Sequence, residues 1–216
     1  MIEKTIDKKE LLQKFRTEGI LDAAIKVIAE KGLERATMEQ VAEEAGISKA
    51  TIYLYFKNKE ALYYQCVVDR FERMLGKMRE AASATGDPLE RIRSLISIQL
   101  SGMEKEKDFF RVFLTENMRI FMDPATELGQ GFWQKHEEYS SLVTSAINDG
   151  IRMGRFKEID PGKGFSLLFS MVRGMAMGKI FRGDETPLSS EADFILNVFF
   201  NGIKKEKVAS PSRAGK

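Results

Sequence analysis

The sequence predicts an all-α protein of about nine helices, with a small N-terminal helical domain followed by a larger C-terminal helical domain. Apolar residues recur at three- and four-residue spacing along most of the chain, as at Ile20, Ala24 and Val27. The strict alternation of apolar and polar residues that indicates strands is absent. Glycines and prolines stand between the periodic segments, where they end one helix or begin the next.

The first predicted helix covers about residues 12–31 and follows a charged leader at 1–13. Its apolar stripe includes Ile20, Leu21 and Ile28. Gly32 is expected to end it, because glycine adopts the left-handed conformation after a helix without a steric penalty.

Two short helices with clear start signals follow. Thr37 is a suitable N-cap for the second helix, and Gln40 completes a capping-box pattern. Gly46 is expected to end that helix, and Ser48 to cap a third at about residues 49–56. Two helices joined by a short glycine turn form a helix-turn-helix, whose second helix enters the major groove of DNA.

The rest of the chain is predicted to be helical, with start or stop signals at Asn58, Pro88, Pro124 and Gly154. The expected helices span about residues 59–82, 89–105, 108–121, 125–153, 165–181 and 190–205. The helix at 59–82 belongs in part to both domains, so the expected division is a helix-turn-helix DNA-binding domain at 1–64 and a ligand-binding and dimerisation domain at 65–205. A basic tail at 206–216 is expected to be disordered.

Charge supports DNA binding locally rather than overall. The net charge is only +2, from 34 basic and 32 acidic residues. From Gly46 to Lys59, however, there are three lysines (Lys49, Lys57 and Lys59) and no acidic residue. Such a face suits phosphate binding, which releases counterions. Taken without the helical turn, the same lysines would indicate only a solvated surface.

The residue inventory argues against an enzyme. Cys66 and His136 are the single cysteine and histidine, too few for a zinc site, and their spacing does not indicate a nucleophilic pair. A glycine loop that could hold a phosphate is absent, and no cofactor or metal is expected. The sequence also lacks a secretory signal and an apolar run of about 18 residues, so we expect a cytoplasmic protein without a membrane span.

The segment GLERATMEQVAEEAGISKATIYLYFKNKEAL, which begins at Gly32 and ends at Leu62, resembles the N-terminal domain of the TetR family of bacterial transcriptional repressors. The resemblance covers about residues 14–64, and its matching pieces include Thr37, Ala45-Gly46-Ile47-Ser48 and Thr51-Ile52-Tyr53. The remaining chain resembles the family only in length and helical pattern. The resemblance implies a DNA-binding regulator, most simply a homodimeric repressor that a small lipophilic ligand releases from its operator.

The predicted DNA contacts lie mainly at the start of the third helix. With Ile52 and Phe56 facing inward, Lys49, Ala50 and Tyr53 face outward, and Thr51 lies near the edge of that face. The resemblance implies phosphate contacts at Tyr53 and Lys59 and a backbone contact at Thr37, whereas Tyr55 is expected in the core. The full predicted set is Thr37, Ser48, Lys49, Ala50, Thr51, Tyr53, Lys57 and Lys59.

The last two helices are the expected dimer surface, because the resemblance implies a four-helix bundle formed with the same helices of a second copy. The residues expected there are Phe165, Leu168, Met171, Met175, Gly178, Ile195, Val198 and Phe199. The alternative is that these apolar stripes are core within one chain. A dimer would place two recognition helices about 34–36 Å apart on a pseudo-palindromic operator.

An unusually aromatic segment at 109–139 is a candidate ligand pocket, although each of its residues could equally be plain core. The candidate pocket residues are Phe109, Phe113, Glu116, Asn117, Phe121, Trp133, His136 and Arg173. An acidic group there would suit a lipophilic cation, and Arg173 or His136 a carboxylate or acyl chain; the sequence does not decide between them. A regulator without a small-molecule effector, controlled by a protein partner, stays an alternative, as does an activator.

Overall fold

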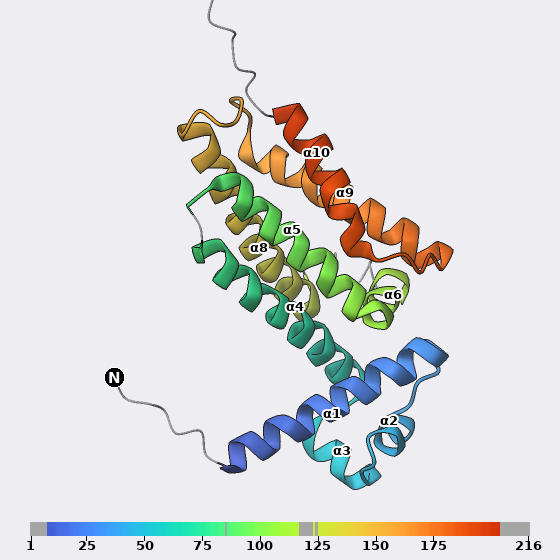
Figure 1. Ribbon diagram of the computed structural model, residues 1–216. Helices are drawn as coiled ribbons and strands as arrows, with labels where there is room; N and C mark the ends of the chain where they lie inside the picture. The colour runs from blue at the N-terminus through green and yellow to red at the C-terminus, as the bar shows by residue number, and fades with distance from the viewer. Residues whose placement is uncertain (1–7, 85, 117–122, 124, 204–216) are drawn as a thin grey trace, which may run out of the picture.

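The structure is a computed structural model that describes residues 8–84, 86–116, 123 and 125–203. All regular elements in these ranges are helical, which confirms the all-α prediction (Figure 1). They are α1 (Lys8–Lys31), α2 (Met38–Glu44), α3 (Lys49–Tyr55), α4 (Lys59–Ala84), α5 (Pro88–Lys105), α6 (Lys107–Glu116), α8 (Glu127–Arg152), α9 (Pro161–Arg182), the 3-10 turn η1 (Leu188–Glu191) and α10 (Ala192–Ile203).

The local signals around the helix-turn-helix act as expected. Thr37 accepts a hydrogen bond from the backbone N–H of Gln40, whose side chain accepts one from the backbone N–H of Thr37, so the capping box is complete. The Ser48 hydroxyl accepts the N–H of Thr51. Gly32 and Gly46 take φ angles of 79° and 67°, which glycine tolerates better than other residues.

Several helix ends differ from the sequence prediction. Helix α1 begins at Lys8, inside the expected leader, because residues 8–13 are strong helix formers with no glycine or proline to stop the helix. Helix α9 begins at Pro161, capped by the carboxylate of Asp160. The sequence prediction overlooked this pairing of a cap with an N-terminal proline. The basic tail at 206–216 lies outside the described residues.

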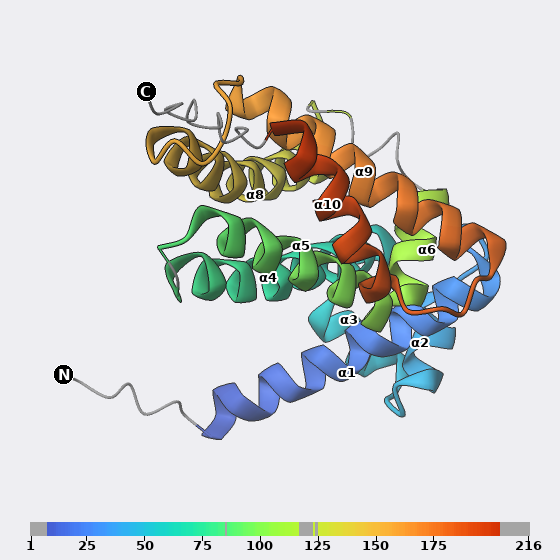
Figure 2. The ribbon, with the colours of Figure 1, turned by 45° about the horizontal axis from the view of Figure 1, so that its top comes forward.

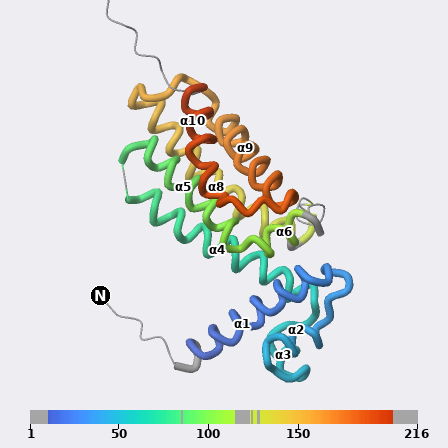
Figure 3. Tube along the Cα trace, turned by 45° about the vertical axis from the view of Figure 1, so that its right-hand side comes forward, coloured from blue at the N-terminus to red at the C-terminus, as the bar shows by residue number. Residues whose placement is uncertain are grey.

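The helices form two parts joined by α4. In Figure 1, α1, α2 and α3 lie together at the lower end, and α4 rises from them into a bundle with α5, α8, α9 and α10. Figure 2 shows α9 and α10 side by side on the outside of that bundle. The tube in Figure 3 shows the same order, with α6 close to the N-terminal helices. Helix α1 packs against α2, α4 and α6, so the two parts are in direct contact.

A continuous apolar core extends through both parts. It includes Ile20 and Ile52 in the N-terminal helices, Leu75 in α4 and Val143 and Val172 in the bundle. Among the described residues, no helix combines the length and the apolar content needed to cross a membrane. Within the same ranges, no group of three or more His, Cys, Asp or Glu side chains is arranged to hold a metal.

Candidate DNA-binding surface and ligand cavity

Helix α3 presents one side to solvent and buries the other. Ile52 is fully buried and Phe56, at the C-cap, is also buried, so these two side chains fix the helix against the core. Lys49, Ala50 and Tyr53 are exposed. This arrangement leaves the start of α3 free to approach a DNA groove.

The other residues of α3 and the turn after it differ in exposure. Thr51 is half-buried at the edge of the exposed face, and Tyr55 is half-buried and packs against the core. Lys57 is exposed in the turn before α4. Leu54 was not predicted as a surface residue, yet it is 84% exposed on α3. An apolar side chain at that position can contact the methyl group of a thymine.

The positive charge of Lys49 is partly neutralised by a carboxylate of the protein itself. Its Nζ lies 2.5 Å from the Glu39 carboxylate of α2, and both side chains are largely exposed. The hydrogen bond and the opposite charge raise the pKa of Lys49 and lower that of Glu39. Because the pair is solvated, Lys49 can exchange this partner for a base or a phosphate at small cost.

Lys59 has a structural role in addition to its predicted one. Its ammonium donates to the carbonyl oxygens of Leu33 at 2.7 Å and Glu34 at 3.0 Å, which ties the start of α4 to the turn after α1. An ammonium carries three donors, so one N–H remains for a phosphate. Thr37 is exposed, and its hydroxyl is already the cap of α2.

An aromatic cavity of about 110 Å³ lies in the C-terminal bundle. Its walls come from α4 (Phe71, Met74, Leu75), α5 (Gln99, Met103), α6 (Phe110, Phe113, Leu114), α8 (Phe132, Trp133, Lys135, His136, Tyr139) and α9 (Phe169, Arg173). The rings of Phe71, Phe113 and Phe132 contact one another at centroid distances of 5.4–5.8 Å. Packed aromatic rings therefore make up much of the cavity wall, with a few polar side chains among them.

The structure places only some of the predicted pocket residues at this cavity. Phe113, Trp133, His136 and Arg173 line it. Phe109 is fully buried behind the lining, in contact with the rings of Phe110 and Phe113. The remaining three, Glu116 (its side chain), Asn117 and Phe121, lie outside what the structure describes.

The sequence prediction missed the contributions of α4 and α5 to the cavity. Phe71 and Met74 on α4, and Gln99 on α5, come from segments remote from 109–139. A signal was present in the amphipathic pattern of α4, whose residues Phe71, Met74, Leu75 and Met78 recur at helical spacing. That pattern indicates a buried face, but it does not show that the face borders a cavity.

Three polar groups of the cavity illustrate its chemistry. The hydroxyl of Tyr139 donates to Gln99 Oε1 at 2.6 Å, and both residues are buried. His136 is surrounded by the rings of Trp133 and Phe169, at 5.2 and 5.1 Å, and burial lowers its pKa. A neutral imidazole and a buried amide can orient an uncharged polar atom of a ligand.

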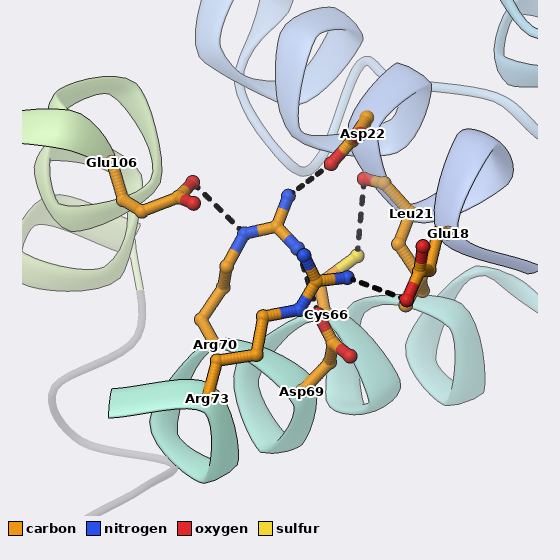
Figure 4. Close-up of polar contacts among 8 residues, drawn as sticks. All are labelled: Glu18, Leu21, Asp22, Cys66, Asp69, Arg70, Arg73 and Glu106. Atoms are coloured by element: carbon orange, nitrogen blue, oxygen red, sulfur yellow. Dashed lines mark hydrogen bonds and ion pairs between the residues drawn. The ribbon is translucent and has the colours of Figure 1, made fainter. Parts of the chain in front are cut away.

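A buried arginine connects the N-terminal helices to the bundle (Figure 4). The Arg70 side chain of α4 is 4% exposed, and it pairs with Asp22 of α1, with Asp69 and, at 2.9 Å, with Glu106 between α5 and α6. Arg73, one turn later, contacts Asp69 at 2.8 Å. We call Arg70 and its three carboxylate partners the Arg70 cluster.

The apolar surface of α9 and α10 differs from the predicted dimer surface. Phe165, Leu168, Ile195 and Phe199 are buried within the chain and are unavailable to a partner. They face inward because α8 and α5 cover that side; the Phe165 ring, for example, packs 5.4 Å from Tyr139 of α8.

Other residues form the exposed face of these two helices. Met171, Met175 and Gly178 are half-buried. Val198, at 49% exposed, is the clear outward member of the predicted set. The large apolar side chains that are exposed on α9 and α10 are Leu167, Phe181, Phe194 and Val198.

Comparisons with known proteins agree with this architecture. Residues 20–66 match the family model of bacterial regulatory proteins of the tetR family. The chain is 32% identical over 158 residues to the HTH-type transcriptional regulator YhgD of Bacillus subtilis, covering 73% of this chain and 76% of that protein. It is 24% identical over 185 residues to the fatty acid metabolism regulator protein of the same organism, covering 85% and 93%.

A solved structure shows the same fold. The crystal structure of the transcriptional regulator FadR from Bacillus subtilis, in complex with stearoyl-CoA, superposes with a TM-score of 0.76 at 24% identity, covering 86% of this chain and 98% of that one. The family is one of transcriptional regulators rather than enzymes. From the family match, the extent of the identity to YhgD and the shared helical architecture, the chain belongs to the TetR family of bacterial regulatory proteins.

Proposed function

We propose that the protein is a homodimeric transcriptional repressor that leaves its operator when a small lipophilic ligand fills the aromatic cavity. The observation that carries this proposal is the course of α4, which begins beside the DNA-binding helices at Lys59 and lines the cavity with Phe71, Met74 and Leu75. Residues 1–64 then act as the DNA-binding domain and 65–205 as the ligand-binding and dimerisation domain.

The cavity lining favours a neutral or anionic ligand over a lipophilic cation. Its described residues include Lys135, His136 and Arg173 and no carboxylate. A cation would therefore lack a countercharge in this lining. An acyl chain would meet apolar walls, and a carboxylate would meet Arg173 and Lys135, the second of which also pairs with Glu72. The solved complex of Bacillus subtilis FadR with stearoyl-CoA supports the same ligand class in a protein of this fold.

Dimerisation is supported by the exposed apolar face of α9 and α10. Leu167 and Phe181 on α9 lie on the same side as Gly174, where no atom lies within 4 Å of an added Cβ. Phe194 and Val198 form the corresponding face of α10. A two-fold interface uses the same patch on both copies, so this face can pair with itself and hold two α3 helices at a fixed separation.

Ligand release requires a difference in affinity between two states. A ligand that prefers the DNA-free arrangement by about 5.5 kcal/mol shifts an equilibrium almost completely. Helix α4 can transmit that preference, because it contacts the cavity at its middle and packs against α1. The alternative function is a DNA-binding regulator controlled by a protein partner, in which the cavity would have no ligand.

Two single substitutions, each compared with the parent protein, test the proposed DNA contacts. Footprinting on the DNA upstream of its own gene identifies a binding site, and affinity is then measured for that site and for scrambled DNA across salt concentrations. Lys49→Ala is expected to reduce the preference for the site over scrambled DNA, because Lys49 lies at the base-facing start of α3. Lys59→Ala is expected to weaken binding to the footprinted site and to scrambled DNA about equally. It should also lower the slope of log affinity against log salt concentration by about one.

The outcomes separate the two functions. Unchanged binding in both variants would show that α3 does not read DNA. If apolar compounds that bind the protein leave its affinity for the footprinted site unaltered, the ligand-responsive repressor is rejected in favour of the regulator controlled by a partner.

A further inference from the structure

A second cavity, of about 390 Å³, lies between α4 and α5 beside the aromatic cavity. Its lining carries four basic side chains, those of Arg70, Arg73, Lys77 and Lys105, and one acidic side chain, Glu106. We call it the cationic groove.

In the part of the chain that the structure describes, some basic side chains of this groove are paired with carboxylates, and others are not. Arg70 and Arg73 are held by carboxylates of the Arg70 cluster and its neighbours. Lys77 and Lys105 are exposed, and neither forms an ion pair within the ranges that the structure describes. The groove therefore presents two uncommitted ammonium groups on facing helices, next to two guanidinium groups.

The groove and the aromatic cavity share a wall. Met74 and Phe110 line both of them. Met74 is an unbranched, adaptable side chain, and Gly102 faces it from α5: a Cβ added at Gly102 would lie 3.8 Å from its sulfur. Met74 therefore lies at the boundary between the charged groove and the apolar cavity, and its side chain is of the kind that changes rotamer easily.

We propose that the cationic groove binds the anionic head, a carboxylate or a phosphate, of an amphiphilic effector whose apolar chain passes Met74 and Phe110 into the aromatic cavity. This inference rests on the proposed function, because it assigns the polar end of the same ligand. The head interacts with Lys77 and Lys105, and the chain lies against the aromatic lining.

The groove lies beside the ion pairs that join the N-terminal helices to the bundle. Glu106 lines the groove and accepts a hydrogen bond from Arg70 Nε at 2.9 Å. A bound anion competes with Glu106 for Arg70, whose two terminal nitrogen atoms, Nη2 and Nη1, hold Asp22 of α1 and Asp69. Binding of the head thus changes the ion pairs that tie α1 to α4 and to the turn before α6.

The test uses three twelve-carbon probes that differ only in the head: dodecanoate, dodecyl phosphate and dodecanol. Trp133 is the single tryptophan and lines the aromatic cavity, so its fluorescence reports occupation by any of the chains. The protein variants are Lys77→Gln/Lys105→Gln, the control Lys157→Gln/Lys163→Gln, whose lysines line neither cavity, and Glu106→Gln.

Removing both groove lysines is expected to weaken the binding of dodecanoate, of dodecyl phosphate or of both by about threefold to tenfold, while the affinity for dodecanol stays unchanged. Loss confined to dodecyl phosphate identifies a phosphate head, and equal loss for both anions identifies a site for either. Glu106→Gln is expected to increase the affinity for the same anions about twofold to fivefold, because the substitution removes the competing carboxylate. The control variant should bind all three probes as the parent protein does.

Two results would overturn the proposal. Equal weakening of dodecanol and the anions would show that the lysines support the fold, and unchanged binding of the anions in both groove variants would place the head elsewhere. In either case dodecanol binding would leave the proposed apolar effector site intact. If no probe alters Trp133 fluorescence, the ligand part of the proposed function fails and the groove assignment fails with it.

Discussion

Replacing Arg70 with methionine removes the buried cation that joins α1, α4 and the turn before α6. Methionine fills a similar volume without charge, so the main loss is that of the three ion pairs rather than of packing. The Arg70 side chain is 4% exposed, whereas the side chains of Asp22, Asp69 and Glu106 are 65%, 21% and 37% exposed.

The size of the effect follows from these exposures. Breaking a buried ion pair by removing one partner usually costs about 3–5 kcal/mol, because a charge is left buried and unpaired. Here the abandoned carboxylates reach water, and Asp69 keeps Arg73 at 2.8 Å. We therefore expect Arg70→Met to lower the free energy of unfolding by about 2–3 kcal/mol, below the usual range for that reason.

The assay is urea denaturation at fixed protein concentration, followed by circular dichroism. Arg93→Met is the matched control, since Arg93 pairs with Asp193 at 2.6 Å and the two side chains are 43% and 88% exposed. Such a surface pair should contribute less than about 1 kcal/mol. If Arg70→Met cost no more than Arg93→Met, the Arg70 cluster would not be a structural tie between the two parts.

Further predictions follow from a close contact, a buried thiol and a buried imidazole. Gly150→Ala should destabilise the protein by about 1–3 kcal/mol in the same assay, because the new methyl group would lie 2.1 Å from a ring carbon of the buried Phe156. Gly76→Ala in α4, where no atom lies within 4 Å of the new methyl group, should stabilise the protein by up to about 1 kcal/mol. Similar changes in stability for the two variants would contradict the predicted contact with Phe156. Burial raises the pKa of the Cys66 thiol to about 12, so a thiol reagent at pH 8 should label the protein only after unfolding, and rapid labelling of the native protein would refute the burial. Burial lowers the pKa of His136, so the unfolded chain takes up a proton near pH 6.5 before the folded protein does. The stability that this difference contributes should be fully present above that pH and should fall as the pH drops below it. The fall between pH 7 and 5 should be smaller in His136→Phe, and an equal fall in both proteins would contradict the prediction.

The sequence by itself determined the helix-turn-helix and most helix ends, because these depend on short-range chemistry. Thr37 and Gln40 cap one another within a single turn, and Gly32 and Gly46 provide left-handed positions that other residues avoid. These interactions need no partner from elsewhere in the chain. The start of α9 at Asp160 and Pro161 follows the same short-range rules, since a capping carboxylate precedes an N-terminal proline.

Only the tertiary structure decided which faces of the C-terminal helices are buried and where the cavity lies. Helix α9 is apolar on more than one side, so its spacing could not show that Phe165 and Leu168 turn inward while Leu167 and Phe181 face solvent. The aromatic cavity likewise depends on α4 and α5 meeting α8, segments far apart in sequence. Periodicity assigns a residue to a face of its own helix, but the neighbour that covers the face, or leaves a space beside it, is set by packing between distant helices.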